Sequence, residues 1–576
     1  MPRFNNKEVA ELFANIGDLL EIKGENRFKI LAYRKAADNI AGLGQDLFNL
    51  WEAGQDLKKI EGIGQAIADK SAELFETGKL EFWEKLIAEV PESLVDVLNI
   101  PDVGPKLAKS MWQELGLTTV AEVKAAAQAG KLQTLPRMGA KSEARILASI
   151  EALERRDTGR VHLGIAWPLA MTVIATLEKL PEALKVEVAG SLRRMRETIG
   201  DLDFLVATEQ PEPIMAAFKA MNDVQEVIAA GETKSSVRFR NGLQADLRCL
   251  EPSRWGTALQ YFTGSQAHNV KVRELAQKKG YSLNEYALTR ESDGEKLSFE
   301  QEADLYEFLG LAYIPPQLRE DRGEIKAAQN KSLPELVQVG DIKGEVHCHS
   351  TWSDGAQSIE EMARAAMERG YEYLVITDHS QSLGIANGLT PERLRRQRQE
   401  IDDVQAKLPG IRLLQGTEME IKADGSLDFS DEVLAELDFV VASVHTGLRQ
   451  DRETLTKRML AAINNPYVHL IGHPSGRLLT QREAGDFDME AIMHAAAETG
   501  TALEINASPE RLDLNDAHVR RAIELGVDLM INCDAHHAAG FENMRFGVAT
   551  ASRGWATAES IVNTLPWEKF AMRLKH

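Results

Sequence analysis

The C-terminal part of the chain, from about residue 341, alternates short apolar segments with stretches long enough to form a helix. The apolar segments are 344–349, 371–379, 411–420, 437–445, 467–473, 501–506 and 527–536. Each one ends in a polar residue or in a residue type that binds metals. Parallel strands that alternate with helices and carry their chemistry at the C-terminal strand ends are typical of an α/β barrel. We therefore expect such a barrel over residues 341–576.

Histidine is concentrated in this region, which holds all but two of the chain's 13 histidines. The spacing of two in His347/His349 and in Asp534/His536 makes each pair face one side of its strand. The candidate metal ligands are His347, His349, Asp354, His379, Glu418, His445, His473, Asp534 and His536. These donors are too many for one tetrahedral ion, and they predict two or three Zn²⁺ or Mn²⁺ ions. Core packing would explain a single histidine, but not its recurrence at successive strand ends.

Three repeats near the N-terminus share an apolar residue, a short turn that ends in glycine, and a following helix. The turns end in Gly64, Gly104 and Gly139; the first also has Gly62, where the second has Asp102. A glycine turn before a helix start presents free amides to an anion, as a helix-hairpin-helix does when it holds a DNA phosphate. A helix C-cap followed by another helix would explain one copy. Three copies favour DNA binding without sequence readout, with the second copy least suited because of its acid.

Three aspartates fall on predicted strands in the middle of the chain. Asp201 and Asp203 share one strand face, and Asp246 lies in a strand that follows a hairpin turn at Asn241-Gly242. If the hairpin packs beside the first strand, the three carboxylates converge and require cations such as Mg²⁺. A pair of such ions clamps the attacking and leaving oxygens of a phosphoryl transfer. A solvated strand face is the alternative for the first two aspartates.

The turn before the first aspartate strand favours the catalytic interpretation, because Gly190-Ser191 with two arginines suits a triphosphate. Here the chain resembles family X of the DNA polymerases, typified by DNA polymerase beta. The matching runs are GSLRRMRETIGDLD at 190–203, ADLR at 245–248, YFTGSQAHN at 261–269 and LNEY at 283–286. The resemblance spans about residues 1–320 and implies an α+β nucleotidyltransferase palm with a thumb.

The resemblance also implies roles for single residues. Asp201, Asp203 and Asp246 would be catalytic and bind Mg²⁺, with Mn²⁺ as an alternative, and Asp246 would lie nearest the primer 3′-hydroxyl. The nucleotide would contact Gly190, Ser191, Arg194, Gly200, Tyr261, Phe262, Gly264, Asn269 and Arg273. Ile199 stands where the family commonly has a small hydroxyl residue before the glycine at position 200. Lys70 stands where the lyase subset of the family has a Schiff-base lysine, although a lysine there is more commonly solvated or in contact with a DNA phosphate.

The histidine-rich region resembles the polymerase and histidinol phosphatase (PHP) domain, a distorted α/β barrel of phosphoesterases. No ligand position of that domain is missing over residues 341–576, which implies an active site. The domain order resembles the bacterial and archaeal form of family X polymerase. The predicted domains are a helical DNA-binding region (1–85), two further helix-hairpin-helix repeats (86–155), palm (156–255), thumb (256–320), linker (321–340) and PHP domain (341–576).

Composition limits the setting in which such a chain works. Three scattered cysteines suit a reducing compartment, and the absence of a long apolar run excludes a membrane span or a signal peptide. We therefore expect a cytoplasmic monomer without a membrane partner. The net charge of −21 argues against nucleic-acid binding at first sight, so phosphate contacts must come from local cations and backbone amides.

The sequence thus predicts a repair-type, gap-filling DNA polymerase joined to a PHP 3′-5′ exonuclease or 3′-end-processing phosphoesterase. Its partners would be gapped or primer-template DNA and deoxynucleoside triphosphates. Two alternatives stay open. The barrel could hydrolyse a small phosphomonoester unconnected with DNA, or the whole chain could serve as a DNA-gap-binding scaffold with weakened catalysis.

Overall fold

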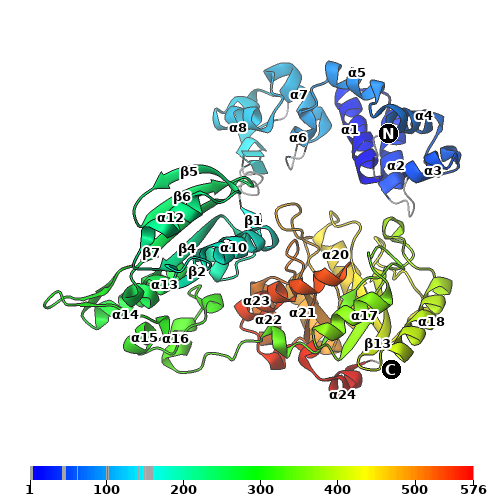
Figure 1. Ribbon diagram of the computed structural model, residues 1–576. Coiled ribbons are helices and arrows are strands. Elements are labelled where there is room, and N and C mark those ends of the chain that lie inside the picture. Colours follow the sequence, from blue (N-terminus) through cyan, green and yellow to red (C-terminus); the bar gives the residue numbers. More distant parts are fainter. Residues whose placement is uncertain are drawn as a thin grey trace. The chain divides into compact units, whose positions relative to one another are not determined.

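The computed structural model describes residues 4, 6–41, 47–60, 62–98, 100, 103–135, 138–140, 142–144, 146–147, 149–150 and 160–574 (Figure 1). It forms two compact units, one of Met1–Thr158 with Gln381–Gly388, and one of Gly159–Ser380 with Leu389–His576. Asp102, which the sequence singles out in the second repeat, lies outside the described residues. None of the described helices combines the length and apolarity needed to cross a membrane.

The N-terminal part of the first unit is helical. Its α-helices are α1 (Asn6–Lys23), α2 (Arg27–Ala41), α3 (Leu47–Glu52), α4 (Gln65–Thr77), α5 (Glu81–Glu89), α6 (Leu94–Leu98), α7 (Pro105–Leu115) and α8 (Val120–Gln128). Their apolar faces share one core that includes Phe13, Phe75 and Met111. Gly64 and Gly104 are the N-caps of α4 and α7, and neither end has a side-chain cap. The first amides of both helices are therefore open to an anion.

The predicted palm opens the second unit with a five-stranded sheet in the order β2-β4-β7-β6-β5. Its strands are β2 (Lys185–Val188), β4 (Asp201–Ala207), β5 (Val224–Ala230), β6 (Lys234–Phe239) and β7 (Gln244–Leu250), and β1 (Val161–His162) pairs separately with β3 (Thr198–Ile199). Helices α10 (Leu163–Leu177) and α12 (Pro211–Lys219) share a core with Phe204, on one face of β4. Period-two alternation puts the aspartates of β4 on the opposite face.

The predicted thumb follows without a break. It consists of α13 (Trp255–Thr263), α14 (Gln266–Lys278), β8 (Tyr281–Leu283), β9 (Leu288–Arg290), β10 (Lys296–Leu297) and α15 (Glu302–Phe308). The stretch predicted as a linker, residues 321–340, contains α16 (Glu324–Gln329), and its Ala328 and Leu336 join the thumb core. The buried carboxylate of Glu324 lies 2.7 Å from His268 Nδ1, so this stretch is anchored to the thumb.

The C-terminal domain is a seven-stranded parallel sheet in chain order, β11 to β17, as the alternating pattern predicts. Its strands are β11 (Gly344–Cys348), β12 (Tyr373–Ile376), β13 (Arg412–Glu420), β14 (Phe439–Ser443), β15 (Leu470–Ile471), β16 (Ala502–Asn506) and β17 (Leu529–Asn532). Its α-helices are α17 (Ile359–Glu368), α18 (Pro391–Lys407), α19 (Asp431–Leu434), α20 (Arg452–Ile463), α21 (Met489–Thr499), α22 (Asp516–Leu525), α23 (Met544–Arg553) and α24 (Trp567–Phe570). A parallel bridge between Cys348 and Ala535 connects the two ends of the sheet, so the barrel is nearly closed.

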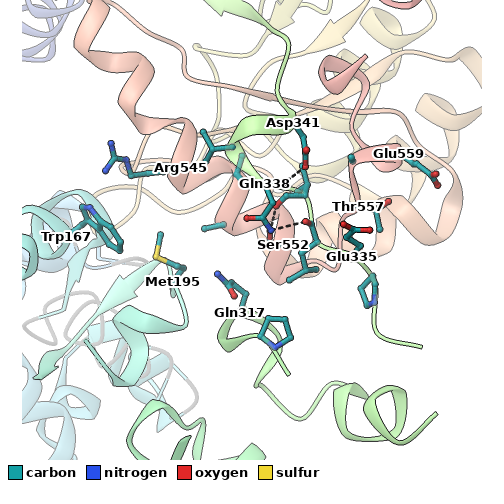
Figure 2. A pocket seen from close by; sticks show the side chains of 18 residues that line it. Trp167, Met195, Gln317, Glu335, Gln338, Asp341, Arg545, Ser552, Thr557 and Glu559 are labelled. Atoms are coloured by element: carbon teal, nitrogen blue, oxygen red, sulfur yellow. Dashed lines mark hydrogen bonds between the residues drawn. The ribbon is translucent and has the colours of Figure 1, made fainter. Parts of the chain in front are cut away.

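A pocket of about 960 Å³ lies inside the second unit, between the palm and the barrel (Figure 2). Trp167 and Met195 line its palm side, and Arg545 and Ser552 of α23 line its barrel side. The stretch before β11 forms part of the wall, where Ser552 Oγ donates a hydrogen bond to the carbonyl of Val337. None of the residues that line this pocket is a predicted site residue, so the candidate sites lie elsewhere.

Candidate active sites

The turn between β2 and β4 has a backbone that only glycine fits. Gly190 has φ +59°, and a Cβ there would lie 2.4 Å from Oδ2 of Asp203. The turn therefore packs directly on the catalytic candidate. Ser191 Oγ is buried beside it and has no hydrogen-bond partner within the part of the chain that the structure describes. An unpaired buried hydroxyl is costly unless a ligand satisfies it, which fits the predicted phosphate contact.

The three aspartates lie on neighbouring parallel strands, as predicted. Asp203 on β4 stands directly opposite Asp246 on β7, and Asp201 is two residues away on the same face. Burial, together with the charges of Asp201 and Asp246, raises the pKa of Asp203 to about 6. Burial also opposes ionisation of Asp246, but hydrogen bonds, first from Lys234 at 2.9 Å, outweigh it and lower its pKa. Crowded carboxylates that already attract an ammonium group fit a site for Mg²⁺.

The predicted nucleotide contacts are arranged around the end of α13. The rings of Tyr261 and Phe262 meet edge to face, and Asn269 donates a hydrogen bond to the carbonyl of Tyr261. Gly264 has φ +73°, and a Cβ there would lie 3.0 Å from the Arg194 guanidinium. That guanidinium donates to the carbonyl of Thr263 at 2.5 Å and to Glu320 at 3.1 Å.

Two other predicted nucleotide contacts are Gly200, which precedes α13 in the chain, and Arg273, which follows it. Gly200 directly precedes β4, and a Cβ there would lie 2.8 Å from the Arg160 guanidinium. Arg273 is half-buried on α14.

In the helical unit, Lys70 Nζ lies 4.9 Å from the ring centre of Phe82, which is a cation–π distance. Gly62, in the first repeat, has φ +80°. In the third repeat, the carbonyl of Gly139 accepts hydrogen bonds from the amides of Ser142 and Glu143, so a helical turn starts there as at the other repeats.

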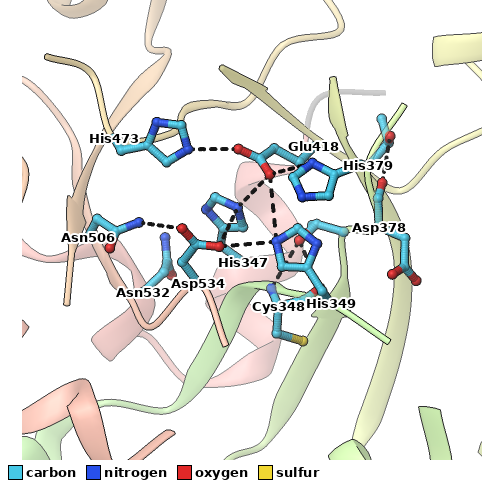
Figure 3. Close-up of polar contacts among 12 residues, drawn as sticks. His347, Cys348, His349, Asp378, His379, Glu418, His473, Asn506, Asn532 and Asp534 are labelled. Carbon is cyan, nitrogen blue, oxygen red and sulfur yellow. Dashed lines mark hydrogen bonds and ion pairs between the residues drawn. The ribbon is translucent and has the colours of Figure 1, made fainter. Parts of the chain in front are cut away.

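The strand ends of the barrel bring eight of the nine predicted ligands into three overlapping groups. Figure 3 shows the central part of this cluster, where Glu418 and Asp534 lie among the imidazoles of His347, His349 and His379. The groups are His349, Asp354, His379 and His536; His347, His349, Glu418 and Asp534; and His379, Glu418 and His445. In each group one ligand atom per residue lies within 4.8 Å of every other. His473, the ninth, joins through Nε2, which lies 2.8 Å from Glu418 Oε1. The spacing of two brings His347 and His349 into one group, and Cys348 packs in the apolar core behind the site. Asp534 and His536 lie beyond the end of β17, where Asp534 has φ +51°, and they belong to different groups, so the prediction that they share a strand face is wrong.

The donors of this cluster fit metal ions on the evidence of the structure itself. Five buried side-chain atoms of the cluster make no hydrogen bond to a described residue: His347 Nε2, His349 Nδ1, His379 Nδ1, Glu418 Oε2 and His473 Nδ1, with His379 Nδ1 and Glu418 Oε2 facing each other at 3.0 Å. Burial, with the imidazoles of His379 and His536, lowers the pKa of His349 to about 4, so it is neutral as a ligand must be. Burial opposes ionisation of Glu418, yet the surrounding histidines hold its pKa well below the ordinary range. At His347, His379, His445 and His536, burial opposes protonation, but neighbouring carboxylates outweigh it and raise the imidazole pKa, so a bound cation would take the place of protons. Imidazoles and ionised carboxylates gathered around buried donor atoms fit such a cation.

An outer layer of carboxylates and amides orients the ligands, and sequence reasoning missed it. Glu504 accepts from His347 Nδ1 at 2.7 Å and from the His473 amide at 2.6 Å. Asn506 donates to Asp534 at 3.1 Å, and Glu420 lies 2.7 Å from His445 Nδ1. The only signal in the sequence is that these residues also stand near strand ends. Such partners fix the tautomer and direction of a ligating imidazole.

Arg511 is the other residue that sequence reasoning missed. It lies in the loop after β16, and its Nε is 3.6 Å from Asp534 Oδ2. The side chain is 18% exposed, so the cation borders both the cluster and solvent. A guanidinium in this place can contact an anionic substrate beside the metal ligands.

Family models of known proteins match four parts of the chain. The family models that match are a helix-hairpin-helix domain (residues 4–80), a SAM-like helix-hairpin-helix tandem (93–152), the DNA polymerase beta thumb (258–320) and the PHP domain (345–508). The DNA polymerase/3′-5′ exonuclease PolX of Bacillus subtilis is 39% identical over 561 residues, which is 97% of each chain.

Relatives of the C-terminal domain alone also occur. A probable phosphatase of Thermoanaerobacter sp. strain X514 is 29% identical over 38% of this chain and 89% of its own length. A probable phosphatase of Caldicellulosiruptor bescii is 32% identical over 34% of this chain and 81% of its own length. The full-length match decides the classification, since it covers both candidate sites and the helical region. The chain belongs to family X of the DNA polymerases, in the form that carries a C-terminal PHP domain.

Proposed function

We propose that this chain fills gaps in DNA as a family X polymerase and trims 3′ ends with its PHP domain. The observation that supports it most strongly is the presence of two separate ligand sets in one chain that matches a polymerase/exonuclease over 97% of its length. The polymerase would use gapped or primer-template DNA and deoxynucleoside triphosphates, and the chain would act as a monomer. Its helix-hairpin-helix repeats would hold the DNA backbone through helix-start amides.

In the polymerase site, Asp201, Asp203 and Asp246 would hold Mg²⁺, which supplies charge neutralisation for the oxygens of the triphosphate. The amides of the turn at Gly190, the hydroxyl of Ser191 and the guanidinium of Arg194 would bind the phosphates. Asp246 would orient the primer end. Tyr261 and Phe262 would flank the sugar, while Asn269 and Arg273 would contact the nascent base pair.

In the PHP site, the nine ligands would hold two or three Mn²⁺ or Zn²⁺ ions, which supply an activated water and polarise the phosphate. Mixed imidazole and carboxylate donors suit these ions better than Mg²⁺. Glu504, Asn506 and Glu420 keep the imidazoles and Asp534 in position. Arg511 would contact the 3′-terminal phosphodiester from the loop beside Asp534.

The test uses one gapped duplex carrying a labelled 3′ end, incubated with Mn²⁺ with and without one nucleotide, and in parallel a small phosphomonoester with Mn²⁺. Extension with nucleotide and release of nucleoside monophosphate without it are the expected results. Release of inorganic phosphate from a small phosphomonoester, with no 3′-end hydrolysis, would instead indicate a phosphatase like those named among the PHP relatives. DNA binding with neither reaction would indicate a scaffold.

A further inference from the structure

Arg553, the last residue of α23 in the PHP domain, reaches into the polymerase part of the second unit. Its side chain is only 4% exposed and has three hydrogen-bond partners. It donates to the main-chain carbonyl of Arg194 at 2.9 Å and to Glu320 at 3.0 Å. Its other nitrogen donates to Asp516, the first residue of α22, at 2.7 Å. One barrel side chain thus joins the phosphate-binding turn, the end of the thumb and a second barrel helix.

The contact belongs to a wider network of charges. Glu320 pairs with the side chain of Arg194 at 3.1 Å as well as with Arg553, and Asp516 also pairs with Arg322 at 3.2 Å. Burial opposes ionisation of Glu320, but the two arginines outweigh it and keep its pKa low. Figure 2 shows the same contact zone from the pocket, where Met195 and Ser552, the sequence neighbours of Arg194 and Arg553, lie on facing walls.

The main-chain bond is the informative one. The turn that starts at Gly190 is the short helix α11 (Gly190–Arg193), and Arg194 is its C-cap. The Arg194 guanidinium is held at the same time by Glu320 and by the carbonyl of Thr263. Arg553 fixes both the backbone of this residue and the carboxylate that positions its side chain. A buried charge that loses one partner leaves the others unpaired, so the arrangement is sensitive to removal of any member.

We propose that Arg553 is a positioning residue of the polymerase reaction, through which the PHP domain holds the triphosphate-binding turn in shape. The inference rests on the proposed function of Arg194 as a triphosphate contact. The PHP domain then has a second role, as a structural part of the nucleotide site, besides its own chemistry. It follows that nucleotide binding depends on a residue outside the polymerase domains.

The experiment measures single-nucleotide insertion and 3′-end hydrolysis by the full-length chain with Arg553→Ala. The KM for nucleotide should rise about tenfold, the effect expected for a lost charged hydrogen bond, while kcat and exonuclease rate change little. Arg553→Lys should recover part of the loss, since it keeps the charge but not the planar donor fork. The matched control is Arg545→Ala on the same helix, whose partner Glu542 is exposed, and it should leave the KM unchanged.

Arg194→Ala distinguishes a failure of the proposed positioning role of Arg553 from a failure of the proposal that Arg194 contacts the triphosphate. If Arg194→Ala raises the KM and Arg553→Ala does not, the positioning role of Arg553 is wrong while the triphosphate site stands. If Arg194→Ala leaves the KM unchanged, the proposal that this turn binds the triphosphate is wrong, and the role of Arg553 that rests on it is rejected as well. Should Arg553→Ala not fold, Arg553→Lys and Asp516→Asn carry the test: each should raise the KM by a smaller factor, and two wild-type KM values would overturn the proposal.

Discussion

The polymerase site gathers carboxylates from within two neighbouring strands, whereas the PHP site gathers acidic and imidazole groups at the ends of many strands. The polymerase site has three carboxylates from two strands, and one of them, Asp201, is exposed. The PHP site has nine predicted ligands, with buried donor atoms and an outer layer of hydrogen-bond partners. Under the proposed function, the first site would need substrate oxygens to complete a coordination shell, whereas the second would hold its ions before substrate arrives. The comparison therefore contrasts a metal site assembled with the substrate and one built into the fold, and both halves of this contrast can be tested.

Crossed substitutions test whether the sites are chemically separate, and they should have the largest effect. Asp203→Ala should lower nucleotide incorporation by on the order of 10²–10³-fold or more, because a charge-stabilising group at the reacting phosphate is lost. His347→Ala with His349→Ala should remove 3′-end hydrolysis to a similar extent. Both reactions are followed on one labelled gapped duplex.

Each variant serves as the control for the other. Asp203→Ala should keep wild-type hydrolysis, and the double histidine variant should keep incorporation within a few-fold. Loss of both reactions in either variant would mean that the sites are not separable. Incorporation by Asp203→Ala within tenfold of wild type would reject the carboxylate assignment.

Much of each site could be predicted because it repeats a local pattern. A spacing of two residues in a strand places His347 and His349, or Asp201 and Asp203, on one face whatever surrounds them. The outer layer could not be predicted in this way, since Glu504 meets His347 from a strand 157 residues away. The bond from Arg553 to Arg194 joins positions 359 residues apart. Contacts of that kind depend on how domains pack, which no local period encodes.

The fold shows the same limit at two segments. Seven parallel strands follow from the alternating pattern, yet β15 is only Leu470–Ile471, because the chain turns at once into the loop that carries His473. The stretch from 315 to 342, which starts at Pro315-Pro316 and carries many charges, has the composition of a linker, but its Glu324 is buried against His268. A pairing between distant polar groups decides that conformation, so composition alone points to the wrong state.

Metal retention distinguishes a built-in site from one completed by substrate. The wild-type chain is loaded with Mn²⁺ and Mg²⁺, and free metal is then removed by gel filtration. The PHP site should keep about two or three Mn²⁺ ions, whereas Mg²⁺ at the polymerase site should be lost. Elemental analysis of the eluted protein gives the count. Asp203→Ala should retain the same number of ions as wild type, and His347→Ala with His349→Ala should retain fewer. A lower count for Asp203→Ala would place a resident ion in the palm.

Removing one member of the outer layer should weaken the PHP site without abolishing it. Glu504 holds His347 Nδ1 with one carboxylate oxygen and the amide of His473 with the other. Glu504→Gln keeps one acceptor oxygen and replaces the other by an NH2 donor, so one of these contacts is lost and Mn²⁺ affinity should fall about 10–100-fold. A competition titration with a metal indicator measures it in the absence of DNA. Glu510→Gln, an exposed glutamate in the following loop, is the matched control and should bind as wild type does. Equal affinities for the two variants would show that the outer layer does not orient the ligands.

The smallest effect is expected at Lys234, whose ammonium lies 2.9 Å from Asp246 Oδ2 and competes with a cation for that carboxylate. In Lys234→Met the competing charge is gone, and the Mg²⁺ concentration at half-maximal incorporation should fall about two- to fivefold, in keeping with a partly exposed ion pair. Lys296→Met on β10 removes an exposed lysine of the thumb and should leave the half-saturating concentration where it was. The Mn²⁺ requirement of 3′-end hydrolysis should not move in either variant, because the PHP ligands are complete without Lys234. The half-saturating Mg²⁺ concentration could instead rise in Lys234→Met. This lysine would then help to bind the nucleotide and would not compete with the metal. The polymerase site would in that case be more fully formed before substrate binding than its three aspartates indicate.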